Sequence, residues 1–342
     1  MAKTVCFGEI MLRLSPPGFE RLFQSPVFQA TFGGGEANVA VSLAQFGCES
    51  HYVTRVPDNP IGDAVVRTLR GEGVRTGHVQ RGGSRLGIYF AETGASQRPS
   101  TVLYDRSLSA ISEIQPGTVP WAEVFAGADW FHCTGITPAL SRSAAECTRE
   151  AIEAARRAGV RVSVDLNYRR KLWSEREAQQ TMRPLMRLVD VVMANEEDLQ
   201  AVLGIEVPHA DVTGGQLSVD GYRTAAGRVA TEFGVKKVAV TLRESLSASD
   251  NAWSAVLLDS ESGSFHQSQR YTISLVDRIG GGDSFAAGLI YSLLAGRDSG
   301  ESLRFAVAAS ALKQTIPGDF NRVSVNEVEQ LAAGDTSGRV RR

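Results

Sequence analysis

Short apolar runs alternate along the chain with longer segments in which apolar residues recur at helical spacing. This alternation is typical of βα units stacked on a largely parallel sheet. Several runs are continuously apolar, which indicates that helices cover both faces of the sheet. The predicted strands are KTVCFGEI, SHYVTRV, ADWFHCTG, VRVSVDLN, VDVVMAN and KKVAVTL. The predicted helices are 36–46, 61–72, 142–158, 176–187, 196–203, 222–233, 283–295 and 301–314.

Two segments, 11–35 and 85–107, break this alternation. Both contain Pro/Gly turns and no helical pattern, and in the second the run LGIYFA places different residues on alternate faces of a strand. We expect these segments to form a small antiparallel sheet that projects from the α/β body and can cover a ligand. Residues 1–335 are expected to form a single domain, and residues 336–342 a loose tail.

Composition limits the partners and the compartment. The 342 residues include 36 basic and 38 acidic side chains, a net charge of −2, so nothing favours nucleic acid or an anionic membrane as a partner. No apolar run reaches the roughly 18 residues that span a bilayer, and no signal sequence is recognisable, so we expect a cytoplasmic protein. Four widely spaced cysteines form no CxxC pair and are expected to be reduced and buried: Cys6, Cys48, Cys133 and Cys147.

The stretch DRIGGGDSF, residues 277–285, places three glycines before an apolar helix. Glycines allow backbone amides to approach an anion closely, and Asp283 at the start of the helix is kept ionised by the helix dipole. An ionised carboxylate beside a phosphate site can accept a proton from a hydroxyl, as phosphoryl transfer requires. The alternative is an ordinary glycine turn with Asp283 as the helix cap, because GGG is neither GxGxxG nor a P-loop.

A second glycine cluster occurs in TFGGGEANVAVSLAQFG. Residues 33–35 precede a predicted helix that is bounded by Gly47, and Asn38 lies in its first turn. The Asn38 amide can both donate to and accept from hydroxyl groups, which suits a polyol ligand. The alternative is a simple turn from strand to helix with a polar residue near the cap.

Together the two clusters resemble the signatures of ribokinase-like (PfkB) carbohydrate kinases. GGGEANVAVSLAQFG resembles the amino-terminal signature and DRIGGGDSFAAGLIY the carboxy-terminal one, and the resemblance spans residues 3 to about 332. It implies an α/β three-layer sandwich with a central, mostly parallel sheet and a small β-sheet lid. It also implies ATP-dependent phosphorylation of a sugar hydroxyl, with Asp283 as the base and the amides of Gly280, Gly281 and Gly282 as the anion hole.

The resemblance extends to Mg²⁺, which the family positions through water with an N-x-x-E element. Here NEEDL supplies Asn195 and Asp198, and Glu196 or Glu197 can substitute for the missing glutamate. The alternative is a solvated helix start that is rich in acids. The expected cofactors are therefore ATP and Mg²⁺, and the resemblance leaves open whether a monovalent cation is also used.

The nucleotide loop departs from the family pattern. TLRESLSASDN replaces the common G-x-x-G nucleotide loop. In the other glycine loop, Gly281 stands where alanine is common, which makes that loop more flexible without removing a backbone amide. An exposed turn is the alternative to a nucleotide contact at this place. The predicted nucleotide contacts are Asn167, Asn195, Thr241, Arg243 and Ser245.

Two arginines point to the class of sugar. Arg106 and Arg169 each follow a predicted strand, where side chains commonly point into the cleft of an open sheet. Because a guanidinium binds a carboxylate through two hydrogen bonds, the pair favours an acidic sugar over a neutral hexose. The alternative is that the arginines are solvated or bind nucleotide phosphates.

Nearby residues resemble those of 2-keto-3-deoxygluconate kinases in particular. The shared elements are a tyrosine in the first lid strand, Y-x-R at 104–106, D-x-N-x-R at 165–169 and a late Gly-Asp at 318–319. The resemblance implies phosphorylation of 2-dehydro-3-deoxy-D-gluconate to its 6-phosphate, with arginines on the carboxylate and tyrosine hydroxyls on other oxygens. The substrate contacts that it implies are Gly34, Gly35, Asn38, Tyr89, Tyr104, Arg106, Arg169 and Asp319.

Three alternatives differ in function. The chain can be a fructokinase-like or other sugar kinase of the same family, or a non-catalytic sugar sensor on the same scaffold. A nicotinamide-dependent dehydrogenase fits poorly because the first glycine loop lacks GxGxxG spacing. Family members often pack their lids together, and a half-polar flap leaves an apolar face exposed, so we expect a homo-oligomer.

Overall fold

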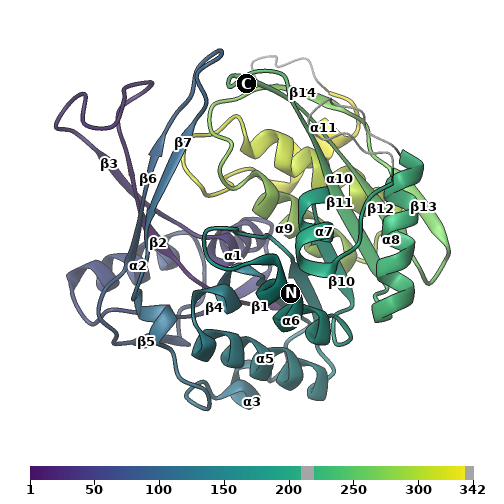
Figure 1. Cartoon of the computed structure of the whole chain (residues 1–342), viewed down its shortest axis with the longest axis horizontal. Coiled ribbons are helices and arrows are strands. Elements are labelled where there is room, and N and C mark those ends of the chain that lie inside the picture. The colour runs from purple at the N-terminus through teal and green to yellow at the C-terminus, as the bar shows by residue number, and fades with distance from the viewer. Residues whose placement is uncertain (209–218, 336–342) are drawn as a thin grey trace.

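The computed structural model describes residues 1–208 and 219–335, so the predicted tail at 336–342 lies outside the described residues. In spatial order, the main sheet contains β13 (Ser264–Gln267), β12 (Asp250–Asp259), β11 (Lys237–Ser245), β10 (Val191–Ala194), β9 (Arg161–Asp165), β8 (Trp130–Thr134), β1 (Lys3–Phe7), β4 (Glu49–Val56) and β5 (Val79–Arg81) (Figure 1). The sheet is parallel from β11 to β5 and antiparallel at the β12 edge, where β14 (Tyr271–Ser274) also pairs with β12.

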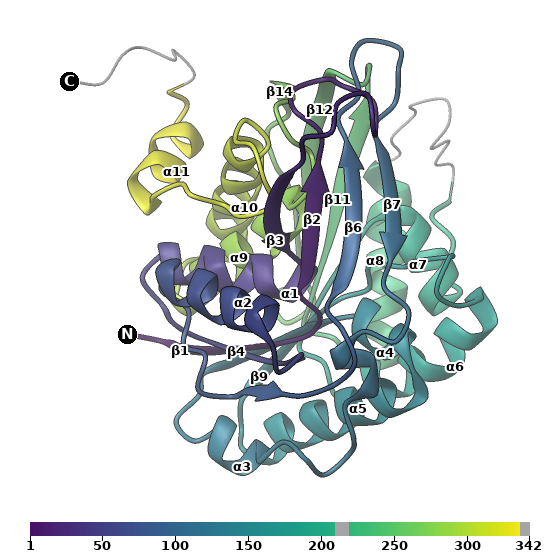
Figure 2. The same cartoon turned by 90° about the vertical axis from the view of Figure 1, so that its left-hand side faces the viewer.

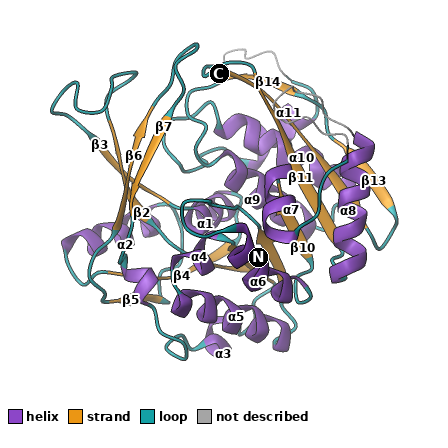
Figure 3. Cartoon of the chain, viewed as in Figure 1, coloured by secondary structure: helices purple, strands orange, loops and turns teal. Residues whose placement is uncertain are grey.

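Helices cover both faces of this sheet, as the continuously apolar strands predict (Figures 1 and 3). One apolar cluster contains α3 (Trp121–Val124), α5 (Arg142–Arg157), α6 (Glu175–Met186), α7 (Glu196–Leu203) and α8 (Val219–Phe233). The cluster on the other face contains α1 (Gly35–Gln45), α2 (Pro60–Gly71), α9 (Gly281–Leu294), α10 (Ser299–Lys313) and α11 (Val325–Ala332). Two short elements complete the body: the 3-10 helix η1 (Ala110–Glu113), which precedes α3, and α4 (Ile136–Leu140), which follows β8. The predicted three-layer α/β fold is confirmed.

A separate four-stranded sheet forms the lid, which Figure 2 shows beside the body. Its order is β3 (Gln29–Gly33), β2 (Met11–Ser15), β6 (Gly87–Glu92) and β7 (Thr101–Asp105), all within the two predicted segments. The prediction of a purely antiparallel lid is wrong, because β2 and β6 pair in parallel. β2 follows β1 and β6 follows β5, and these strands of the parallel region point the same way, so both enter the lid from one edge of the main sheet.

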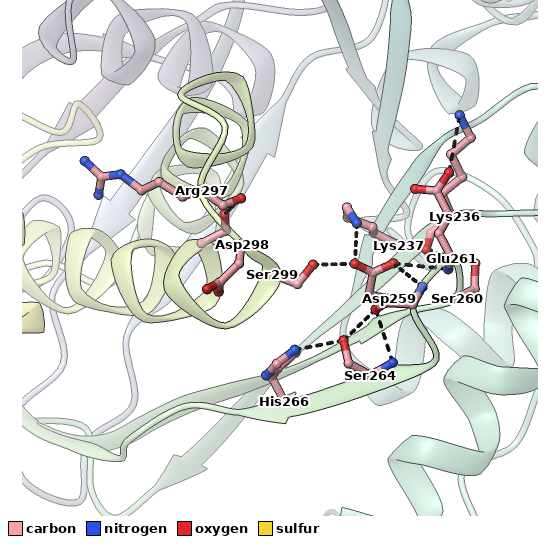
Figure 4. A network of polar contacts seen from close by, with 12 residues as sticks. Lys236, Lys237, Asp259, Ser260, Glu261, Ser264, His266, Arg297, Asp298 and Ser299 are labelled. Carbon is pink, nitrogen blue, oxygen red and sulfur yellow. Dashed lines mark hydrogen bonds and ion pairs between the residues drawn. The ribbon is translucent and has the colours of Figure 1, made fainter.

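An acidic side chain at the end of β12 fixes the start of α10 (Figure 4). Asp259 accepts hydrogen bonds from the Lys237 ammonium and the Ser299 hydroxyl, each at 2.7 Å. Burial by itself raises the pKa of Asp259, but these two contacts outweigh it and lower the pKa to about 2. The carboxylate therefore stays ionised at neutral pH and holds α10 against the sheet.

The cysteines meet the expectation from composition in part. All four cysteines are free thiols, and three are buried, whereas Cys48 is only half-buried. Among residues 1–208 and 219–335, no helix has the length and apolar character needed to cross a membrane.

Candidate active site

Several candidate site residues lie where the parallel strands of the main sheet end. In a parallel sheet, loops from neighbouring strands meet at the carboxyl edge, so residues distant in sequence converge there. Glu9 follows β1, Asp165 ends β9 and Asn195 follows β10. The amino termini of α1 and α9 reach the same region, because an amide in the first helix contacts a carboxylate in the second.

The two glycine clusters meet through Asn38. The Asn38 Nδ2 donates to Asp283 Oδ2 at 2.6 Å, and its Oδ1 accepts from the amide of Gly34 at 3.2 Å. A Cβ on Gly35 would lie 3.6 Å from Asp283 Oδ1, so the absent side chain leaves room beside that oxygen. Asn38, predicted to contact the sugar, thus orients the carboxylate through its amide.

The surroundings of Asp283 suit a base that works near neutral pH. Desolvation raises the pKa of this half-buried carboxyl to about 6, although the Asn38 hydrogen bond lowers it. The charge of Asp319 raises the pKa further, and that of Arg169 opposes this. Asp283 is therefore ionised at pH 7 yet basic enough to accept a proton.

Free backbone amides surround this carboxylate at the start of α9. Gly280 has φ +86°, which glycine adopts without strain, and the helix begins at the next residue. The amide of Gly281 donates to the carbonyl of Arg278 at 3.3 Å. Within the described chain, the amides of Gly280, Gly282 and Asp283 have no assigned acceptor. Such unpaired N–H groups at a helix start form an anion site.

A buried ionic network joins the lid to this loop. The Arg13 guanidinium in β2 bridges the carboxylates of Asp277, at 2.6 Å, and Asp319, at 2.7 Å. The Tyr89 hydroxyl in β6 donates to the other Asp319 oxygen at 2.6 Å. Tyr89 and Asp319, predicted substrate contacts, therefore bind each other here. Arg13 and Asp277 were not predicted from the sequence, although a charge inside the apolar strand MLRLS is a usable signal.

A second buried ion pair lies where β7 leaves the lid. Arg106 is 8% exposed and pairs with Glu9, whose other oxygen accepts from the Ser109 hydroxyl at 2.6 Å. Among the described residues, no hydrogen-bond partner reaches the buried Nε of Arg106. The Arg106 guanidinium also lies 5.2 Å from the ring centre of Tyr104, which is 42% exposed. Sequence analysis did not single out Glu9.

The comparisons with known proteins identify the family. A model described as the pfkB family of carbohydrate kinases matches residues 1–321. The chain belongs to the pfkB family of carbohydrate kinases. The crystal structure of 2-dehydro-3-deoxygluconokinase from Thermotoga maritima has a TM-score of 0.94, with 50% identity over 98% of this chain and 100% of that one. The 2-dehydro-3-deoxygalactonokinase of Haloferax volcanii is 34% identical over 98% of both chains. The 2-dehydro-3-deoxygluconokinase of Thermoproteus tenax is 29% identical over 97% of this chain and 94% of that one.

Asp165 and Asp198 are further acidic residues near Asp283 in this carbohydrate kinase. Burial raises the pKa of Asp165 well above its usual value, and the charges of Asp198 and Asp283 raise it further. Asn167, with φ +39°, donates to Asp165 at 3.4 Å. Asp198 accepts from the backbone amide of Asn195 at 3.2 Å, within a capping box at the start of α7. This part of the kinase thus gathers acidic side chains near Asp283.

The remaining predicted residues are more exposed. Asn195 caps α7 and, like Glu197, lies at the surface, and the Thr241 hydroxyl donates to the carbonyl of Ala194 at 3.4 Å. Arg243 and Ser245 are exposed on β11, where no contact joins them to Asp283. In the described part of the kinase, no three His, Cys, Asp or Glu side chains are arranged to hold a metal directly.

Proposed function

We propose that this kinase transfers the γ-phosphoryl group of ATP to the terminal hydroxyl of 2-dehydro-3-deoxy-D-gluconate, forming the 6-phosphate. The observation that carries the proposal is the buried Arg106, whose Nε has no hydrogen-bond partner among the described residues. Its partner Glu9 approaches the first glycine loop so closely that a Cβ on Gly34 would lie 2.1 Å from the Glu9 carbonyl. A neutral hexose needs no such cation, whereas a keto acid offers a carboxylate.

Asp283 accepts the proton from the terminal hydroxyl as the hydroxyl oxygen bonds to the γ-phosphorus. The bond from that phosphorus to the bridging oxygen breaks, and ADP leaves with the bond electrons. The free amides of Gly282 and Asp283 bind the oxygens of the group in transfer, where negative charge concentrates. Asn38 holds the base in place through its 2.6 Å hydrogen bond.

The carboxylates of Asp165 and Asp198 fit an outer-sphere Mg²⁺. Burial, and then the charge of Asp198, raise the pKa of Asp165, and a divalent cation held through water would favour its ionised form. Bound Mg²⁺ neutralises phosphate charge in such reactions. Direct ligation is not favoured, since Asp198 already accepts two backbone hydrogen bonds, from Tyr168 and Asn195.

The lid supplies the dry environment that the reaction needs. Met11, Tyr89 and Ala91 on its inner face form one apolar cluster, against which Ile279 of the glycine loop packs. This contact brings the lid against the loop that binds the phosphoryl group. Excluding water there favours transfer to the sugar over hydrolysis of ATP.

A substrate panel tests this function. ATP consumption should be coupled and compared for 2-dehydro-3-deoxygluconate, its galacto epimer, fructose and ribose, and kcat/KM should be highest for a keto-deoxy acid. The two epimers are included because relatives of both names match this chain over nearly its full length. Preference for fructose would favour a fructokinase-like enzyme instead. Absence of turnover with every sugar would favour a sensor.

The arginine variants test the carboxylate clamp. Arg169→Met should raise KM for the keto acid by about 10- to 100-fold, because a charge-assisted hydrogen bond is lost, while any turnover of neutral sugars stays unchanged. Arg106→Lys should do the same while keeping a cation beside the buried Glu9. Arg157→Met is the control, because its side chain is 71% exposed and pairs only weakly. Equal losses for acidic and neutral sugars would contradict the clamp.

We also propose that a second copy of the chain covers the outer face of the lid. Leu12, Ile88, Phe90 and Leu103 share that face by register, and Leu103 is 47% exposed. Leu103→Glu should convert a dimer or larger assembly into monomers in light scattering. Ile61→Glu, an exposed position on α2, should leave the assembly intact. A wild-type monomer at micromolar concentration would contradict this proposal.

A further inference from the structure

A fully buried lysine lies behind the glycine loop. Lys313 is the last residue of α10, a helix of otherwise small and apolar buried residues, and it is 0% exposed. Its ammonium donates to the backbone carbonyl of Asp277 at 3.2 Å and to that of Ile279. No carboxylate among the described residues lies within ion-pair distance of it. Since a buried charge is costly without compensation, these carbonyls are its essential partners.

The position of this ammonium bears on the anion site. All peptide bonds in the described chain are trans, so the amide that follows a carbonyl points the opposite way. With the Ile279 carbonyl turned toward Lys313, the amide of Gly280 is turned away from it. That amide has no assigned acceptor in the described chain. A cation on the carbonyl also polarises the peptide and makes its N–H a stronger donor.

Packing fixes this arrangement tightly. A Cβ on Gly280 would lie 3.1 Å from Lys313 Cε and 2.1 Å from the carbonyl oxygen of Asp319. The loop therefore rests directly on the lysine stem. Burial lowers the pKa of Lys313, and the nearby charges of Asp277 and Asp319 oppose that change. At its other end, α10 is fixed by Ser299 on Asp259.

We infer that Lys313 is a built-in cation that positions the anion-binding amides and makes turnover independent of added monovalent ions. Backbone carbonyl oxygens are also the ligands that hold K⁺ in proteins, so an ammonium on two of them fills the role that such an ion would have. The inference rests on the phosphoryl-transfer function proposed above. Lys313 is fully buried behind the loop and acts through the loop backbone, so it is a positioning residue.

The test compares cations and variants in one assay. Wild-type kcat should agree within about twofold in K⁺, NH₄⁺ and tetramethylammonium buffers, since the cation is part of the chain. Lys313→Ala should lose about 10²-fold in kcat, as removal of an anion-hole donor does. Small K⁺ or NH₄⁺ should restore at least about a tenth of the wild-type kcat by occupying the space left. Lys313→Met should be equally slow and not restored, because its side chain fills that space.

A second measurement separates this inference from the proposed function. The melting temperature of Lys313→Ala should rise on adding K⁺ or NH₄⁺, and that of the wild type or of the exposed-lysine control Lys236→Ala should not. Dependence of wild-type kcat on K⁺ would overturn the inference, as would a loss in Lys313→Ala that no small cation restores. A wild type that phosphorylates no sugar in any buffer refutes the proposed function, and the melting shifts then still decide the cation site.

Discussion

Replacing Asp283 with asparagine is expected to lower kcat by about 10²- to 10⁴-fold, because the variant has no carboxylate to accept the hydroxyl proton. The change preserves shape, so the Asn38 amide keeps an oxygen acceptor at the same place. KM for the sugar should change little, since the base acts in the transition state. Steady-state kinetics together with calorimetric sugar binding checks this, and near-normal turnover would remove Asp283 as the base.

The pH profile gives an independent control on the same residue. Desolvation raises the Asp283 pKa to about 6, and only the ionised form accepts a proton. Wild-type kcat/KM should therefore fall about tenfold per pH unit below that pKa and level off above it. The residual rate of Asp283→Asn should be flat over the same range. A wild-type profile without this acid limb would contradict the assignment.

Gly280→Ala is expected to lower kcat by about 10²-fold or more, because the anion-binding amides must move. The added Cβ would lie 2.1 Å from the Asp319 carbonyl oxygen, and backbone cannot yield as a flexible side chain can. The φ of +86° adds strain, so the free energy of unfolding should fall by about 1–3 kcal/mol. Steady-state kinetics and denaturant unfolding measure the two effects.

Gly296→Ala is the control that separates the effect of backbone strain from the effect of moving the anion-binding amides. Gly296 has φ +76°, but a Cβ there would meet no atom within 4 Å, and the residue lies just past the C-terminal end of α9, at the opposite end of that helix from Gly280. This variant should lose some stability and keep full activity. Equal loss of activity in both variants would show that general destabilisation, and not the anion site, explains the effect at Gly280.

The fold could be predicted from the sequence because helix and strand periods are local signals. All eight predicted helices and all six predicted strands occur, with bounds that shift by a few residues. The helix α11 was not predicted, although Ser324 and Glu327 form a capping box there. The antiparallel edge at β12–β14 was not predicted either: β12 is buried on both faces and gives no strand alternation, and β14, which does alternate, is only four residues long. Parallel pairing inside the lid depends on where distant strands enter, which no local pattern records.

The site was predictable only where a motif marks it. Asp283, Asn38 and the glycines belong to recognisable loops, and the structure brings them together. Arg13 and Lys313 belong to no recognisable motif, because their partners lie far away in the chain. Arg13 pairs with Asp319, and Lys313 donates to the carbonyl of Ile279. A charge inside an otherwise apolar element is the one trace that such residues leave in the sequence.

The parallel pair in the lid constrains the order in which the chain assembles. Met11 pairs with Gly87, and α1, β4 and α2 lie between them along the chain. Such a pair cannot form as a local hairpin, because its loop-closure entropy is recovered only after the intervening elements have folded. The lid pairing should therefore form only after α1, β4 and α2 have folded, and it should open in hydrogen exchange at a lower free energy than the central strands. A folding kinase would thus gain its barrier to water only once these elements of the body are in place.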